Sequence, residues 1–336
     1  MKHRFLAAAA LVMLTGQAPL EASAPAPEPA LAPGEIVAKA AAGEWVVIAP
    51  SDLLVMDLAP DAKGKPRRVV IQLMPPPFSV GWTSNVRKLA AAHWWDGLSV
   101  NRVQDNYVVQ WGDADGEDAK KAKRLPPGLA DQNATGYPVR LSEADVSAWR
   151  ASAAAIIAQR PLYPGPVQWS DAPTPDSYAQ FTGFVRGLAV GLEFDSVGAV
   201  AWPVHCYGMV GVGRNLSPDT GSGAELYTVI GHAPRHLDRN IALIGRVIEG
   251  IEHLSSLPRG TGALGFYESA AERTGIASVR LGKEVAGLPQ YEYLSTESQT
   301  FARYADARAN RRDPFFIRPA GGADICNIPV PVRRVK

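Results

Sequence analysis

Arg102 and Gln110 are the side chains of this 336-residue chain whose type and spacing most clearly suggest chemistry. They lie eight residues apart in the stretch 98–113, LSVNRVQDNYVVQWGD, in which Tyr107 to Gln110 is strand-like. A guanidinium is permanently charged and carries several N–H donors, so it can stabilise charge that develops during a reaction. Catalysis of this kind is electrostatic and needs neither a nucleophile nor a cofactor.

Other reactive patterns in the sequence are weak. The segment 260–265, GTGALG, has the spelling of a dinucleotide-binding loop, but it follows the residues 257–259, LPR, rather than a strand. His232 and His236 are four residues apart, but Pro234 between them argues against a helix that would present both to a metal ion. No convincing Ser-His-Asp order or phosphate loop is present, so no metal or other cofactor is expected.

The elements that would position Arg102 and Gln110 are mostly short strands. Residues 52–58 and 67–73 are strand candidates separated by a turn-rich run. A helix is predicted over 85–93, with Thr83 or Ser84 as its N-cap, before a turn at 95–97 leads into the strand that carries Arg102. The 28 prolines and 31 glycines favour many turns and short strands over a helical bundle.

This order of elements and two sequence stretches resemble the cyclophilin-type peptidyl-prolyl isomerases. That family has Phe-His-Arg, followed by a Pro-Gly turn and Gln-Gly-Gly-Asp, where this chain has Val100-Asn101-Arg102 and 110–113, QWGD. The segment 244–250, IGRVIEG, is close to the family's Phe-Gly-Lys-Val-Val-Glu-Gly, and Leu237-Asp238 precedes it at the family's spacing. The resemblance implies a mainly β fold with flanking helices, built on a closed β-barrel.

The resemblance also implies an activity, which is rotation about X–Pro peptide bonds in polypeptide clients without a cofactor. Rotation breaks amide resonance against a barrier of about 20 kcal/mol, and the proline nitrogen becomes pyramidal and basic. By resemblance, Arg102 stabilises this twisted amide and Gln110 holds the arginine and contacts the client. A non-catalytic module that holds proline-containing segments, as a chaperone or scaffold does, is the alternative that the sequence leaves open.

The remaining site residues are also implied by the resemblance. An apolar cup for the proline ring would be formed by Tyr107, Val108, Tyr227 and Leu237. Further substrate-binding positions carry residues unlike the usual ones of the family, namely Gly213, Arg214, Glu225, His236 and Ile241. Glu225 and Tyr227 take these positions if one residue is inserted after the preceding strand; without the insertion, Leu226 and Thr228 take them.

The chain is expected to have four parts. Residues 1–24, with a charged start and a short apolar run, predict a secretory signal peptide, and residues 25–45 predict a Pro/Ala-rich linker. An isomerase domain is expected over 46–282, with a surface insertion at about 114–200 that includes a helix over 142–159 and a strand over 183–194. The range 283–336 is expected to pack on this core as an extension.

The sequence also suggests where the protein acts and with what. The signal peptide indicates a periplasmic or secreted protein without stable membrane insertion, because no later run is long and apolar enough to span a bilayer. The hydrophobic content is 46% and the net charge is +1, which gives no support for nucleic-acid binding. A monomer is expected.

The extension is expected to contain a helix over 298–308 and an edge strand over 325–332, because prolines alternate in that strand and cannot donate to a central ladder. Residues 333–336 are predicted to form a solvated tail. The two cysteines, Cys206 and Cys326, can form a disulfide in an oxidising compartment, and two buried free thiols are the alternative.

Overall fold

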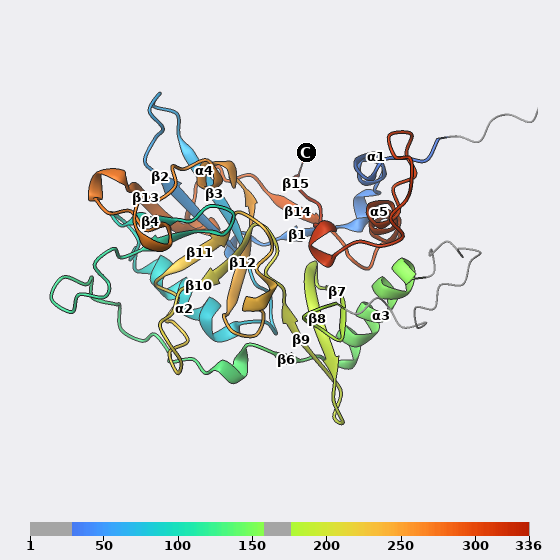
Figure 1. Ribbon diagram of the computed structural model, residues 1–336, viewed down its shortest axis with the longest axis horizontal. Helices are drawn as coiled ribbons and strands as arrows, with labels where there is room; N and C mark the ends of the chain where they lie inside the picture. The colour runs from blue at the N-terminus through green and yellow to red at the C-terminus, as the bar shows by residue number, and fades with distance from the viewer. Residues whose placement is uncertain (1–28, 158–175, 336) are drawn as a thin grey trace, which may run out of the picture.

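The computed structural model describes residues 29–157 and 176–335. Its centre is a closed antiparallel barrel whose strands follow the order β10-β11-β5-β4-β13-β2-β3-β12, with β12 pairing back to β10 (Figure 1). The closed β-barrel expected from the sequence is therefore confirmed. The bounds of its strands are β2 Leu53–Leu58, β3 Arg67–Leu73, β4 Ser99–Val103, β5 Val108–Gly112, β10 Met209–Val212, β11 Leu226–Val229, β12 Leu243–Glu249 and β13 Thr274–Leu281.

The apolar runs of β2 and β3 are buried on both faces of the barrel wall. Leu54 and Ile71 point into the barrel core, whereas Leu53 and Val70 pack outward against Ile48 and other residues of a second sheet. A strand with two covered faces carries nearly continuous hydrophobic residues rather than alternating ones. This requirement explains the sequences LLVMDL and RRVVIQL of these strands.

Two helices contribute to the barrel core. The helix α2 (Val80–Ala91) buries Trp82, Val86 and Leu89 in it, and the short α4 (Glu252–Ser255) adds Leu254. In Figure 1, α2 lies below the barrel and α4 above it. The helix α2 begins earlier than predicted, so Thr83 and Ser84 are inside the helix rather than at its N-cap, which is Ser79.

The inserted segment is a folded layer with its own sheet. It contains β6 (Val139–Arg140), α3 (Glu143–Ile157), β7 (Phe181–Val185), β8 (Leu188–Phe194) and β9 (Ala199–Pro203), and the strands follow the order β6-β9-β8-β7. The single strand predicted over 183–194 is wrong, because Arg186 and Gly187 have positive φ and turn the chain into a hairpin. The predicted helix over 142–159 is present as α3, and residues 158–175 lie outside the described ranges.

The C-terminal extension joins the insertion rather than only the barrel. A three-stranded sheet places β14 (Tyr291–Leu294) between β1 (Trp45–Ile48) and β15 (Val332–Arg334), and α5 (Gln299–Ala309) packs on α1 (Pro33–Ala38). Phe184 and Trp202 from the inserted sheet share one hydrophobic core with Phe301 of α5. The insertion is therefore a structural layer between the barrel and the extension, not decoration on a surface.

Two predicted boundaries change for the same reason. The range 25–45 was predicted as a linker, but from Pro33 onward it forms α1 and the start of β1, because both find partners in the distant extension. The predicted edge strand lies further along the chain, as β15. Arg333 and Arg334, predicted to belong to a solvated tail, instead pair with Glu292 and Glu249 at N–O distances of 2.6 Å and 2.5 Å.

A disulfide joins Cys206, in the loop between β9 and β10, to Cys326 in the extension, with a Cα–Cα distance of 5.1 Å.

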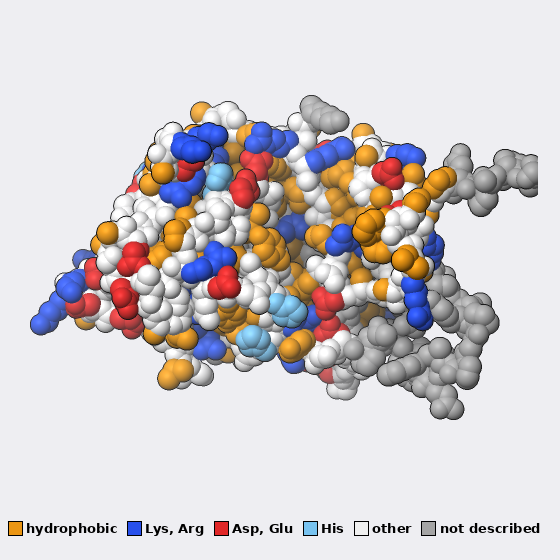
Figure 2. Space-filling view, turned by 45° about the horizontal axis from the view of Figure 1, so that its top comes forward, with side chains coloured by type: hydrophobic (Ala, Val, Ile, Leu, Met, Phe, Trp, Pro, Cys, Tyr) orange, Lys and Arg blue, Asp and Glu red, His pale blue; other side chains and the backbone are white. Residues whose placement is uncertain are grey.

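Figure 2 shows hydrophobic side chains gathered in the hollow between the two halves of the molecule, with positive and negative side chains interspersed elsewhere on this face. Among residues 29–157 and 176–335, no helix has the length and apolar character that crossing a bilayer requires.

Candidate active site

Arg102 and Gln110 face each other across a β-hairpin. The strands β4 and β5 are antiparallel, and their register places Arg102 directly opposite Gln110. Residues that oppose each other in this way present their side chains on one face of the sheet. The Arg102 guanidinium donates through Nη1 to Gln110 Oε1 at 3.2 Å, so the contact between Gln110 and Arg102 that the resemblance implies is present in the structure.

The guanidinium of Arg102 is held in one orientation by three acceptors. Besides the bond to Gln110, Nε donates to the Leu264 carbonyl at 2.8 Å and Nη2 donates to Gln104 Oε1. The rings of Tyr107 and Phe266 flank it, with centroids 5.7 Å and 5.2 Å from Cζ. Burial lowers the pKa of Arg102 from its ordinary value, but arginine starts from so high a pKa that the cation persists at neutral pH.

The glycine-rich segment 260–265 and the Phe266 that follows it supply two of these contacts. A Cβ at Gly265 would lie 2.7 Å from both Gln104 Cα and the Val103 carbonyl oxygen, and Gly265 has a φ of +81°. Only glycine combines that backbone conformation with such a close approach. The segment thus lies against the β4–β5 hairpin and brings the Leu264 carbonyl and the Phe266 ring to Arg102, which explains its glycines without any nucleotide.

Most of the predicted site residues line one cavity of about 750 Å³, which we call the groove. This volume is within the usual range for sites that bind small ligands or short segments. Of the predicted residues, the groove is lined by Arg102, Tyr107, Val108, Gln110, Gly213, Arg214, Glu225, Tyr227, Leu237 and Ile241.

His236 is the predicted substrate-binding residue that does not line the groove. It is exposed and lines a neighbouring cavity of about 390 Å³ with Asp176, Arg235 and Asp238. His236 and Leu237 are consecutive in the short 3-10 helix Arg235–Leu237 but line different cavities, and the substrate-binding role of His236 stays a prediction.

The structure also decides between the two alignments around β11. Glu225 and Tyr227 line the groove, whereas Leu226 belongs to the barrel core and the Thr228 hydroxyl donates to the Met209 carbonyl. Because side chains alternate between the faces of a strand, a shift by one residue would have exchanged these roles.

An apolar cluster forms part of the groove wall. Val108, Tyr227 and Val229 are buried together, and Tyr107 and Ile241 pack against them. The Tyr227 ring lies directly over Gly211, where a Cβ would be 2.3 Å from Tyr227 Cζ. The wall therefore offers the aliphatic and aromatic surface that a proline ring needs.

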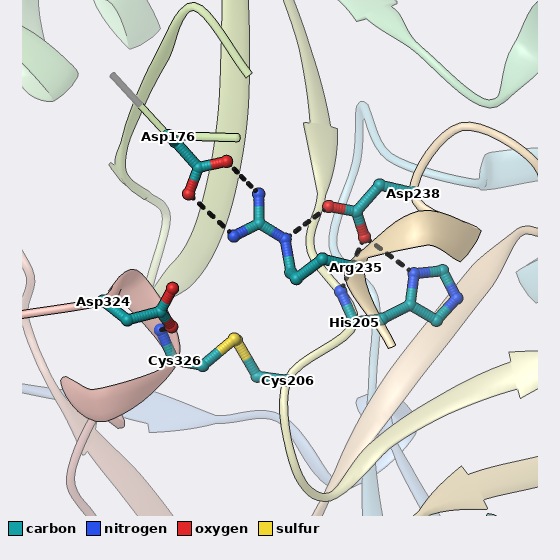
Figure 3. The surroundings of a disulfide bond; sticks show 7 residues. All are labelled: Asp176, His205, Cys206, Arg235, Asp238, Asp324 and Cys326. Carbon is teal, nitrogen blue, oxygen red and sulfur yellow. Dashed lines mark hydrogen bonds and ion pairs between the residues drawn. A yellow bond between two sulfur atoms is a disulfide. The ribbon is translucent and has the colours of Figure 1, made fainter. Parts of the chain in front are cut away.

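A buried polar chain anchors Tyr227 from behind. Its hydroxyl lies 2.9 Å from Nε2 of His205, and Nδ1 of His205 lies 2.9 Å from Asp238 Oδ1. Asp238 also accepts from Nε of Arg235 at 2.5 Å, and Arg235 forms two hydrogen bonds of 2.9 Å to Asp176 (Figure 3). Burial lowers the pKa of His205 and raises that of Tyr227.

Figure 3 shows that the Cys206–Cys326 disulfide lies beside this chain. Cys206 directly follows His205, whose backbone N–H donates to Asp238 Oδ1 at 2.9 Å. The inserted layer, through Asp176, and the extension, through Cys326, are thereby both connected to the segment that carries the groove residue Leu237.

Glu225 is a carboxyl group in the groove wall. Its Oε2 accepts from Gln110 Nε2 at 3.3 Å. Burial raises the pKa of Glu225 to about 7, although hydrogen bonding from Gln110, Asn101 and the Asp113 backbone acts in the opposite direction.

Sequence reasoning missed three contributors to the site, His205, Gln104 and Phe266. His205 and Phe266 are separated from Arg102 by more than a hundred residues and carried no signal in the sequence. Gln104 lies within the stretch 98–113, only two residues after Arg102, and this proximity could have indicated a contact. Within the described ranges, no group of three or more His, Cys, Asp or Glu side chains is arranged to hold a metal ion.

The comparisons with known proteins agree with this geometry. A family model described as "Cyclophilin type peptidyl-prolyl cis-trans isomerase/CLD" matches residues 77–279, more than half of the chain. The crystal structure of a cyclophilin from Hirschia baltica is similar with a TM-score of 0.60 and 19% identity, and the match covers 87% of this chain and 94% of that chain.

More distant similarity is found to a cyclophilin type peptidyl-prolyl cis-trans isomerase from Cryptosporidium parvum, with a TM-score of 0.37, 10% identity, and coverage of 68% of this chain and 97% of that chain. Its structure in the presence of the dipeptide Ala-Pro gives a TM-score of 0.36, 9% identity, and coverage of 68% and 98%. No curated protein matches the chain.

Proposed function

Because the chain belongs to the cyclophilin-type peptidyl-prolyl cis-trans isomerase family, and is an enzyme of that type, we propose that Arg102 performs its catalysis by stabilising the twisted X–Pro amide of a polypeptide client. The observation that carries this proposal is the arginine held in a fixed orientation at the groove wall. Three of its five N–H groups are engaged by Leu264, Gln110 and Gln104, which leaves donors for a client.

The mechanism follows from the change in the proline nitrogen during rotation. In the planar amide, resonance delocalises the nitrogen lone pair and resists rotation by about 18–20 kcal/mol. In the twisted state the lone pair is localised, so a cation directed at the nitrogen favours that state over the planar one. The acceptors around Arg102 fix the guanidinium before the client arrives, so little reorganisation is needed during the rotation.

Client binding is assigned to the rest of the groove. The cluster around Tyr227 and Val108 receives the proline ring, and Gln110 contacts the client backbone while it holds Arg102.

We further propose that the clients are exported proteins and that the enzyme is periplasmic or secreted. The predicted signal peptide at 1–24, which lies outside the described residues, and the Cys206–Cys326 disulfide support an oxidising compartment.

The test is an isomerase assay by exchange NMR on blocked X–Pro peptides with the purified wild type and two variants. Arg102→Ala is expected to lower kcat/KM by about 100-fold or more, because the loss of a preorganised donor typically costs that much. Arg68→Ala is the matched control, since Arg68 lies on β3 outside the groove and pairs with Asp57 at the surface. Its kcat/KM should equal that of the wild type.

Two results would contradict the proposal. Equal activity of Arg102→Ala and the wild type, with both proteins folded, would remove Arg102 from the mechanism. A wild type that binds proline peptides but isomerises none of them would favour a non-catalytic module that holds proline segments.

A further inference from the structure

Glu225 places a titratable carboxyl group next to the residues that orient Arg102. It lines the groove, and its Oε2 accepts the hydrogen bond of Gln110 Nε2 at 3.3 Å. The other end of the same amide, Gln110 Oε1, accepts from Arg102 Nη1 at 3.2 Å. The Gln110 side-chain amide thus connects the Glu225 carboxyl group to the Arg102 guanidinium through two hydrogen bonds. A change of charge at Glu225 can therefore affect Arg102.

The surroundings of Glu225 are suited to the neutral acid. Its Oε1 is enclosed and makes no well-aligned hydrogen bond within the described ranges, and the same holds for Oδ1 of the adjacent Asn101. An enclosed acceptor without a well-aligned donor is unfavourable. Protonation turns the carboxyl group into a possible donor. A carboxylate instead places a negative charge in the enclosed site, and the hydrogen bonds from Gln110, Asn101 and the Asp113 backbone offset only part of the cost of its burial.

The space around the carboxyl is fixed by two glycines. A Cβ at Gly112 would lie 2.0 Å from Glu225 Oε1, and a Cβ at Gly213 would lie 2.9 Å from Glu225 Cβ. Gly112 has a φ of +156°, and both glycines lie beside the groove. The side chain of Glu225 therefore fills a site at the groove wall that the absence of a Cβ at these two glycines leaves open for it.

We propose that Glu225 is a positioning residue whose ionisation controls the isomerase, with the neutral acid as the active form. This inference rests on the proposed function of Arg102. The carboxylate form opposes catalysis because its negative charge offsets the field that Arg102 directs at the client's amide nitrogen, and this effect is strong in a half-enclosed site of low dielectric. The neutral form leaves Gln110 in place and the cation uncompensated.

The other groups around the groove keep their charge while Glu225 titrates. Burial raises the pKa of Glu225 to about 7, between the ordinary values of carboxyls and amines. Arg102 on β4, Arg214 after β10 and Arg273 before β13 remain cations. The charge of Asp113 after β5 acts to raise the pKa of Glu225, and burial raises the pKa of Tyr227 on β11 and keeps it protonated. His205 behind Tyr227 has its pKa lowered by burial.

The experiment is a pH profile of kcat/KM from pH 6 to pH 8 by exchange NMR on a blocked X–Pro peptide without ionisable side chains. The wild type is expected to lose activity as pH rises, by up to about tenfold across a pKa near 7, since the neutral fraction falls by that factor. Glu225→Gln, which keeps the shape and cannot ionise, should show a flat profile at the high activity of the acidic limit.

Glu117→Gln is the matched control, because Glu117 also lines the groove but is exposed. It should retain the pH dependence of the wild type. Carboxyl ¹³C NMR gives a readout independent of activity, in which a resonance that titrates near pH 7 should be present in the wild type and Glu117→Gln and absent in Glu225→Gln.

Each of the remaining outcomes overturns the inference. The same decline with pH in Glu225→Gln and the wild type would assign the titration to another group. A wild type that is active but independent of pH would overturn the role of Glu225 alone. A wild type without isomerase activity at every pH would overturn the proposed function and this inference with it.

Discussion

At the scale of single residues, Tyr227 shows how one side chain can serve the groove and the fold separately. Its ring forms part of the apolar wall, while its hydroxyl is hydrogen-bonded to His205 on the side away from the client. His205 is fully buried and Tyr227 is 4% exposed. A buried ring nitrogen that loses its partner carries the cost of an unsatisfied polar group, which is about 1–3 kcal/mol.

Tyr227→Phe should therefore reduce stability more than activity. The free energy of unfolding is expected to fall by about 1–2 kcal/mol, because His205 Nε2 is left without its partner. The value of kcat/KM should stay within about twofold of the wild type, because the aromatic surface remains. Urea unfolding and the isomerase assay measure the two quantities.

Tyr107→Phe is the control for this comparison, because Tyr107 lines the groove without contacting His205. It should change neither stability nor activity appreciably. A large loss of activity in Tyr227→Phe with unchanged stability would show that the hydroxyl acts on the client rather than on His205.

At the scale of elements, the glycine-rich segment 260–265 and the β4–β5 hairpin behave as one unit. The segment belongs to no strand of the barrel. Phe266, which directly follows it, forms an isolated β-bridge with Arg102, and the Leu264 carbonyl accepts a hydrogen bond from Arg102 Nε. The orientation of the Arg102 guanidinium thus depends on a loop that lies more than 150 residues further along the chain.

Gly265→Val should impair catalysis by displacing this loop. The new side chain meets the Gln104 backbone, so the Leu264 carbonyl and the Phe266 ring should move away from Arg102. A decrease in kcat/KM of about tenfold or more is expected, since small displacements at a reacting centre are costly. The kinetic constants of the isomerase assay test this, with circular dichroism as a check on folding.

Gly128→Val separates this effect from backbone strain. Gly128 has a φ of +82°, nearly the same as Gly265, but a Cβ there would meet no atom within 4 Å. Both substitutions place a β-branched residue at positive φ and share the cost of that backbone strain, whereas only Gly265→Val also meets neighbouring backbone atoms. If both variants lose activity equally, general destabilisation rather than loop displacement is responsible.

At the scale of the whole molecule, the disulfide connects parts of the chain that are 120 residues apart. The inserted sheet and the extension share a core around Phe184, Trp202 and Phe301, and the disulfide lies at the junction of that core with the barrel. A covalent link across so long a loop restricts the unfolded chain strongly. The chain-entropy model gives somewhat under 5 kcal/mol as an upper figure for its contribution.

Replacing both cysteines by serine should lower the free energy of unfolding by about 2–4 kcal/mol. Activity at 25 °C should remain, because neither cysteine lines the groove. Denaturant unfolding of the oxidised protein, the reduced protein and the double variant measures the effect. The reduced wild type is the control and should match the variant; unchanged stability in both would show that the shared core alone holds the extension in place.

The sequence by itself predicted the barrel strands, the family and the contact between Arg102 and Gln110. The strand at 67–73 has exactly the predicted bounds, and Arg102 and Gln110 meet because a hairpin brings together residues only eight positions apart. These features depend on hydrophobic periodicity and on short-range geometry, which a single sequence carries directly.

Only the tertiary structure decided what surrounds that pair. His205 behind Tyr227, the Leu264 carbonyl on Arg102, the outward position of His236 and the joint core of insertion and extension all depend on contacts between distant segments. Local patterns report which face of an element is buried, but they do not report which distant element covers it. The position of Glu225 in the groove wall is of this second kind, because the strands around it are not neighbours in the chain order.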